Sequence, residues 1–200
     1  MGLKLRQGGA KTACRWGWDG DFCTESYALA HKIIKRCDGS RDPEVIYQCL
    51  GIELEDSFDL ANLKGMYSSA DRHRTIYLHR RLEGYLRKFV LMHEICHDQI
   101  PEHRRRARRL PYKEIQFFGG TNKSEREANS VAAHVLIEDN RMLELIRDGY
   151  TTQEIAAALY VPEDLFLIAI EDYCAVHPEF KAHLPRSGRG NYLKDYNILE

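Results

Sequence analysis

The sequence predicts one α+β domain, in which a small antiparallel sheet lies beside a central helix and further helices follow. Short strand-like segments occupy the region from Ile52 to Leu82, where apolar residues alternate with polar ones. Apolar residues then recur at helical spacing up to His97, and again after Ser124. With 200 residues, 44% of them hydrophobic, the chain can bury a core without disulfides.

Charge and hydropathy exclude several classes of protein. The 29 Lys and Arg residues almost balance the 30 Asp and Glu residues, which argues against nucleic acid as the main partner. The longest apolar run, Ile155 to Val161, is far shorter than the roughly 20 residues that cross a bilayer, so no membrane span is predicted. Residues 1–20 lack the apolar stretch of a secretory signal, and we therefore expect a cytoplasmic protein.

The six cysteines are widely scattered and form no C-x-x-C pair. This spacing excludes zinc-ribbon sites and thioredoxin-type redox chemistry, and we expect mostly reduced thiols. The cysteines are Cys14, Cys23, Cys37, Cys49, Cys96 and Cys174.

The N-terminal half is predicted to contain two helices and then the sheet. Residues 1–23 are Gly-rich without periodicity and indicate a flexible arm. Residues 29–37 have helical spacing, and Asp42 followed by Pro43 is typical of a helix start. Three strands are then expected, around residues 52–54, 64–67 and 74–82, and we predict that they pair antiparallel.

A central helix is predicted over residues 82–99, ended by Pro101. Residues 100–123 indicate a long loop, because they hold two prolines, a Gly pair and an Arg-rich run. Ser124 and Glu127 fit a capping box that opens the next helix. Further helices are expected near 140–148, 152–159 and 162–174. The resulting domain plan is an arm (1–23), a core (24–138), C-terminal helices packed on it (139–180) and a weakly ordered tail (181–200).

The predicted central helix carries the motif H-E-x-x-H, formed by His93, Glu94 and His97. Four residues of helix advance by about 400°, so the two histidines lie on one face and can hold one metal ion. Glu94 lies beside that face, where its carboxylate can act as a general base without binding the ion. The alternative interpretation is a pair of half-buried histidines that continue the apolar stripe.

A catalytic zinc requires a third protein ligand, and Glu125 at the start of the next helix is the candidate. Asn129, four residues on, would face the same way and could orient a ligating histidine. Glu127 competes for the ligand role. Two residues of helix turn it about 200° away from Glu125, so it does not face the ion if Asn129 does.

From about residue 25 to 165, the sequence resembles the ImmA/IrrE metallo-endopeptidases of bacteria and their mobile elements. The resemblance rests on Gly51-Ile52, Leu63 to Tyr67, Thr75 to Leu78, His93 to His97, Glu125 to Asn129 and Ala132-Ala133. The family pattern E-x-x-A-N-x-F-A-A-E-L-L-M-P starts with a zinc-ligating Glu, which corresponds to Glu125. Departures from the family are His79 for Asn, Cys96 for Gly, Val131 for Phe, His134 for Glu and Glu138 for Pro. None of these is a proposed ligand, and His134 lies half a turn out of phase with Glu125.

The resemblance implies a gluzincin-like zincin fold and a zinc-dependent endopeptidase, with manganese as the alternative ion and Glu94 as the proton carrier. It also implies a protein substrate, typically a helix-turn-helix transcriptional repressor encoded nearby. The residue that steadies the oxyanion stays open among several candidates. These are Tyr67, His73, His79, His103 and Tyr112.

Other interpretations remain open at this stage. The chain could be a binding or regulatory protein that keeps the fold without turnover. Residues 152–170 have the spacing of a DNA-binding helix-turn-helix, but the helix that would read DNA holds three acids and no Lys or Arg, which favours a role in packing.

The Arg-rich run 103–109 could bind phosphates or an acidic partner, or be a solvated loop. Cys96 could be an oxidisable thiol or a packing residue, and Cys14 or Cys23 could block the metal.

Overall fold

A computed structural model describes residues 20–58, 63–70, 73–108 and 123–183. The arm residues before Gly20, the tail after His183 and Tyr112 lie outside this part of the chain. The helices are α1 (Gly20–Arg36), α2 (Pro43–Cys49), α3 (Gly84–Gln99), α4 (Pro101–Ala107), α5 (Lys123–Leu136), α6 (Asp139–Arg147), α7 (Thr152–Leu159), α8 (Glu163–Val176) and the 3₁₀-helix η1 (Pro178–His183). The strands are β1 (Glu53–Phe58), β2 (Gly65–Ser68) and β3 (Thr75–His79). The α+β class predicted from the sequence is confirmed.

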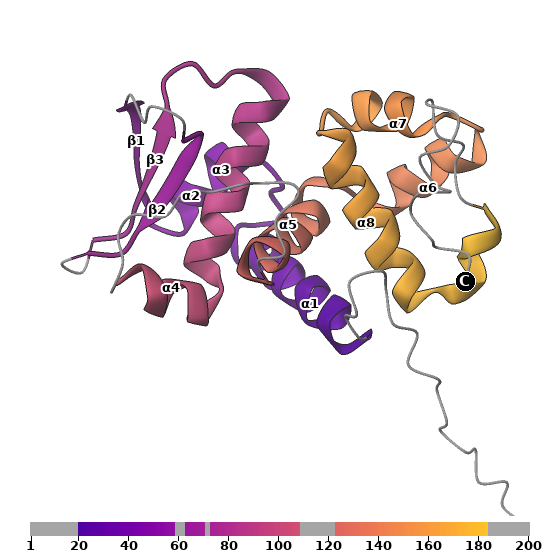
Figure 1. Ribbon diagram of the computed structural model, residues 1–200, viewed down its shortest axis with the longest axis horizontal. Helices are drawn as coiled ribbons and strands as arrows, with labels where there is room; N and C mark the ends of the chain where they lie inside the picture. The colour runs from indigo at the N-terminus through magenta and orange to yellow at the C-terminus, as the bar shows by residue number, and fades with distance from the viewer. Residues whose placement is uncertain (1–19, 59–62, 71–72, 109–122, 184–200) are drawn as a thin grey trace, which may run out of the picture.

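The sheet lies at one end of the molecule, α3, α5 and α1 form its middle, and α6 to α8 form the other end (Figure 1). The strand order is β1-β3-β2, with β2 antiparallel and β1 parallel to β3. The prediction of an all-antiparallel sheet was therefore wrong for β1. β2 follows β1 in the sequence but pairs with the opposite edge of β3. The alternation of apolar and polar residues within a strand does not reveal this strand order.

The core is built around α3 and α5. Buried side chains face almost every direction along the second half of α3, because the sheet, α2 and α5 all pack on it. From α5, Ala128, Ala132 and Ala133 are fully buried. Small side chains at these positions let the two helices approach closely, which brings polar residues on α3 and α5 together.

Two cysteines depart from the expectation of reduced thiols. Cys37 and Cys49 form a disulfide, with 5.8 Å between their Cα atoms. The bond ties the end of α1 to the end of α2. Within the described side chains, Cys96 and Cys174 are buried and take part in no disulfide.

The segment after Pro101 also differs from its prediction, since residues 101–107 form α4 rather than a loop. Proline ends one helix but suits the first turn of another, because that turn needs no backbone N–H from it. Ser124, predicted as the N-cap of α5, lies within this helix, which already includes Lys123. Ser124 accepts a hydrogen bond from Arg106 at 2.9 Å, and Glu127 bonds to His103 at 2.9 Å.

The C-terminal helices pack on the core through α8, which contacts α5 and α1. Leu165, Phe166 and Ile170 are buried, so one face of α8 packs against the core. A capping box formed by Thr151 and Glu154 starts α7.

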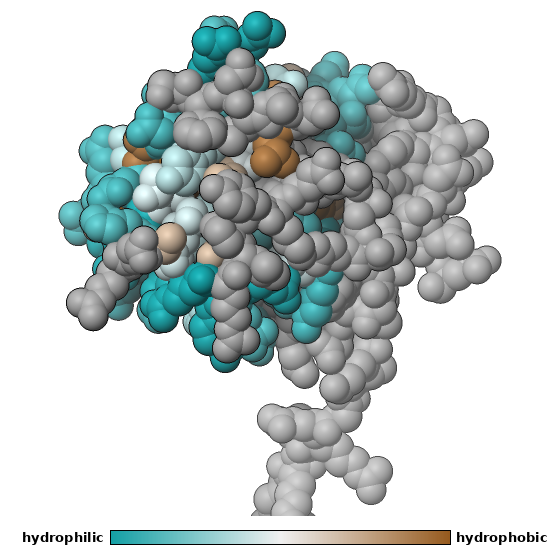
Figure 2. All heavy atoms as spheres, turned by 60° about the vertical axis from the view of Figure 1, so that its left-hand side comes forward, coloured by the Kyte–Doolittle hydropathy of each residue, from teal (hydrophilic) through white to brown (hydrophobic). Residues whose placement is uncertain are grey.

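Among the described helices, none combines the length and apolar character that a membrane crossing requires. On the face that carries the sheet, hydrophilic residues prevail and hydrophobic residues appear in small separate patches (Figure 2).

Candidate metal centre

Three side chains from α3 and α5 converge on one point. His93 Nε2 lies 3.0 Å from His97 Nε2 and 3.1 Å from Glu125 Oε2, and His97 Nε2 lies 3.6 Å from Glu125 Oε2. Ligands about 2.0–2.1 Å from a tetrahedral zinc ion are separated from each other by about 3.3 Å. The three donor atoms are therefore spaced as the ligands of one ion. Within the described residues, no fourth His, Cys, Asp or Glu belongs to this group.

The spacing within each helix explains this convergence. His93 and His97 lie one turn apart on α3, and Glu125 lies in the first turn of α5. Glu127, the competing candidate, is outside the group because it lies on another side of α5 and bonds to His103. The choice of Glu125 over Glu127 thus agrees with the position of both side chains.

Asn129 sets the orientation of His93. Its Oδ1 lies 2.8 Å from His93 Nδ1, and because an amide oxygen can only accept, Nδ1 carries the proton and donates it. The other ring nitrogen, Nε2, is then left with its lone pair directed at His97 and Glu125. A neutral imidazole in this tautomer is the form that binds a metal ion.

His97 is oriented by a second histidine, His103 on α4. The Nδ1 atoms of the two rings lie 3.1 Å apart, and His103 Nε2 lies 2.9 Å from Glu127 Oε2. If His103 donates to the carboxylate, its Nδ1 accepts the proton of His97 Nδ1, and His97 Nε2 is free to bind a metal. Sequence analysis missed this role of His103 and Glu127 because it treated residues 100–123 as a loop.

The electrostatics of the group favour the metal-binding forms of its members. Burial lowers the pKa of His97 to about 4, although Glu125 opposes this effect. Burial by itself would raise the pKa of Glu125, but the neighbouring His93 and His97 rings lower it well below its ordinary value. At neutral pH the group therefore offers a neutral imidazole and a carboxylate, which need no deprotonation before they bind an ion.

Glu94 is fully buried beside this group. Burial and the charge of Glu125 raise its pKa well above the ordinary value, with partial opposition from the backbone of Tyr67. Neither of its carboxylate oxygens has a hydrogen bond of normal geometry. Gly65 on β2 leaves room for it, since a Cβ at that position would lie 2.6 Å from Val90 Cγ1 and 3.0 Å from Glu94 Oε1.

The charges of the site fit a divalent cation. Glu94 and Glu125 are both buried acids, and among the described residues no Lys or Arg forms an ion pair with either of them. Buried carboxylates are costly unless a cation or hydrogen-bond donors compensate them. A metal ion held by His93, His97 and Glu125 would supply that charge.

Three of the residues considered for stabilising the oxyanion form hydrogen bonds with groups outside the metal centre, namely Tyr67, His73 and His79. Tyr67 donates a hydrogen bond to Asp98 at 2.7 Å, and the exposed His73 lies 3.3 Å from Glu53. His79 accepts a hydrogen bond from the backbone of Arg81. Cys96 is fully buried, and burial, with the charge of Glu94, raises the pKa of its thiol, which favours the packing interpretation over an oxidisable thiol.

Comparison with known proteins identifies one family. The Peptidase_M78 family model, described as the IrrE N-terminal-like domain, matches residues 48–171. The matched segment includes the sheet, α3 and α5, and therefore all three converging side chains. No curated protein matches the chain.

Proposed function

We propose that this chain, which belongs to the Peptidase_M78 family, is a zinc-dependent endopeptidase. The observation that carries the proposal is the convergence of His93, His97 and Glu125 beside a buried acid, Glu94. Two imidazoles and one carboxylate with an open fourth position are the ligand set of catalytic zinc sites. Manganese is the alternative ion, because imidazole and carboxylate ligands also accept it.

His93, His97 and Glu125 would hold the zinc ion, with Asn129 and His103 orienting the two imidazoles. Bound zinc supplies a Lewis acid that polarises the scissile carbonyl and lowers the pKa of water. Glu94 would take a proton from the attacking water at a carboxylate oxygen and deliver it to the leaving amide nitrogen. The raised pKa of Glu94 suits a group that must both accept and return a proton.

The position of β2 suggests how a substrate would be held. Among the described residues β2 is an edge strand, and it packs on α3 through Gly65, directly above Glu94. An extended peptide can add to a sheet edge through main-chain hydrogen bonds. Such a segment along β2 would pass over the site with its backbone aligned, whatever its side chains.

The proposed substrate is a specific protein, namely a helix-turn-helix transcriptional repressor encoded nearby. The support for this target is the behaviour of the family that the sequence resembles. Cleavage of such a repressor would relieve repression without direct contact between this chain and DNA.

The substitution Glu94→Gln tests the proposal. The variant should retain one zinc ion per chain, but cleavage of a repressor encoded nearby should fall by about 10²–10⁴-fold, since the general base is lost. The exposed Glu144→Gln is the matched control and should cleave normally. Undiminished cleavage by a metal-loaded Glu94→Gln protein would show that hydrolysis does not use this site.

A further inference from the structure

A basic cavity lies beside α4, the helix that also carries His103. Its volume is about 410 Å³, and its walls come from α1, α4 and the end of α3. Five of the lining side chains are cationic and none is acidic, and they are Lys32, Arg36, Arg104, Arg105 and Arg108. The whole chain has a net charge of −1, so this cavity concentrates positive charge that the rest of the molecule lacks.

Much of this charge is not neutralised within the described residues. Arg104 pairs with the buried Asp98 at 3.2 Å, but Asp98 also pairs with Arg74 at 3.1 Å. Arg105 makes an exposed ion pair with Glu102. No ion pair joins Lys32, Arg36 or Arg108 to an acid in the part of the chain that the structure describes. Like charges held around one cavity repel each other, and a bound anion would relieve that repulsion.

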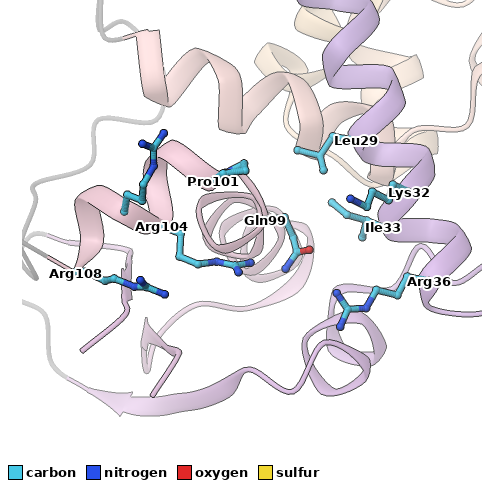
Figure 3. Close-up of a pocket in the computed structure, with 9 residues that line it drawn as sticks. Leu29, Lys32, Ile33, Arg36, Gln99, Pro101, Arg104 and Arg108 are labelled. Carbon is cyan, nitrogen blue, oxygen red and sulfur yellow. The ribbon is translucent and has the colours of Figure 1, made fainter. Parts of the chain in front are cut away.

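The arginines approach the cavity from opposite sides. Figure 3 shows Arg36 of α1 and Arg104 of α4 reaching toward the same space, with Arg108 at its edge. Asp98 holds Arg104 through its carboxylate and its backbone carbonyl, the latter at 2.6 Å. Arg36 immediately precedes the disulfide-bonded Cys37, which fixes the end of α1. The Arg104 guanidinium is therefore preorganised for a ligand, whereas at Arg36 it is the backbone that is held in place.

The lining indicates the chemical class of that ligand. Guanidinium groups match the oxygens of phosphate in a bidentate way. Leu29, Ile33 and Pro101 add an apolar wall that a ring system can contact. The volume falls within the roughly 300–1,000 Å³ of small-molecule pockets, whereas a long nucleic acid needs an extended track. We propose that this cavity binds a small phosphorylated ligand of nucleotide size.

This inference is independent of the proposed peptidase activity, because it concerns a separate site with its own binding readout. The two sites nevertheless share α4, which directs His103 toward His97 and places Arg104, Arg105 and Arg108 around the cavity.

Calorimetric titration of the full-length chain with adenosine diphosphate tests the proposal. Excess magnesium in the buffer prevents the nucleotide from removing other metal ions. We expect one saturable site, and pyrophosphate should compete for it. The exposed pair Arg36→Gln/Arg108→Gln should raise the Kd at least about tenfold, since it removes two guanidinium groups that would donate charged hydrogen bonds to the phosphates. The control pair Arg81→Gln/Arg147→Gln removes the same charge from exposed positions outside the cavity and should leave the Kd unchanged.

Several results would overturn the proposal. They are the absence of saturable binding at millimolar nucleotide, equal weakening by the control pair, and equal affinity for adenosine without phosphate. Binding of duplex DNA alone, with affinity that falls steeply as salt rises, would instead assign these arginines to nucleic acid.

Discussion

Helix α5 carries two buried polar faces, and only one of them is electrostatically complete. Toward α8 it presents Arg126, Ser130 and His134, which all bond to Asp172, so that a permanent cation opposes the buried acid. Toward α3 it presents Glu125 and Asn129, where the acids lie near imidazoles and, in the described part of the chain, pair with no Lys or Arg. The difference teaches that burial of polar groups alone does not mark a functional site. A buried acid that pairs with no Lys or Arg among the described residues is the feature that marks one.

The α3 side also holds an acid with a raised pKa, Glu94 of α3, whereas the pKa of Glu125 beside it is lowered, as is that of Asp172 on the other side. Burial by itself would raise the pKa of Asp172, but Arg126, His134 and Ser130 together lower it. Burial also raises the pKa of Glu94, and there the neighbouring charge of Glu125 adds to the increase. Asp172 and its partners Arg126, Ser130 and His134, here called the Asp172 cluster, therefore stabilise the fold. The burial of Glu94, in contrast, lowers the free energy of unfolding.

The largest expected effect on stability comes from Asp172→Asn. This change removes the fully buried one of the two acids that pair with Arg126 and leaves only Glu171, at 3.2 Å, so the free energy of unfolding should fall by up to about 3–5 kcal/mol. Chemical denaturation measures it. Glu144→Gln breaks the exposed pair with Arg141 and should cost less than about 1 kcal/mol. Similar losses for both variants would contradict the structural role of the Asp172 cluster.

The next largest effect should follow the removal of His103. His103→Ala deprives His97 of its acceptor and should weaken zinc binding by about 10–100-fold, measured by competition with a chromogenic chelator. His103→Asn should restore most of the affinity, because its amide oxygen can accept from His97 Nδ1. A purely structural role of His103 would instead give the same zinc affinity in wild type and His103→Ala.

A pH dependence distinguishes the two faces further. The pKa of Asp172 is lowered below its ordinary value of 3.8. Its stabilising contribution is therefore complete above that value and is lost as the pH falls through the lowered pKa. The stability difference between wild type and Asp172→Asn should therefore stay constant above about pH 4 and shrink as the pH falls below it. A difference that stays constant with pH would show that the Asp172 charge is not what stabilises the cluster.

The smallest expected effect is that of Glu94→Gln on the stability of the metal-free protein. Removal of an uncompensated buried acid relieves its desolvation, and the buried amide offsets part of that gain, so the change should stay within about 1 kcal/mol. Denaturation of the chelator-treated protein measures it. A loss as large as that of Asp172→Asn would erase the contrast between the two faces.

Much of the molecule could be predicted from local pattern. Helical spacing sufficed for α3 and α5, and the phase of Glu125 and Asn129 relative to Glu127 follows from the pitch of one helix. What failed depends on contacts between elements. The parallel pairing of β1, the helix after Pro101 and the Cys37–Cys49 disulfide each require a partner distant from the local pattern. The link from His97 through His103 to Glu127 was missed for the same reason, since it spans three helices.

Metal content tests the central claim most directly. After saturation with zinc and removal of excess ion, the wild-type chain should retain one zinc ion, as should Glu127→Gln, whereas Glu125→Gln and His93→Ala should lose it. Zinc retained equally by Glu125→Gln, or no zinc in the wild type, would contradict a metal centre built from α3 and α5.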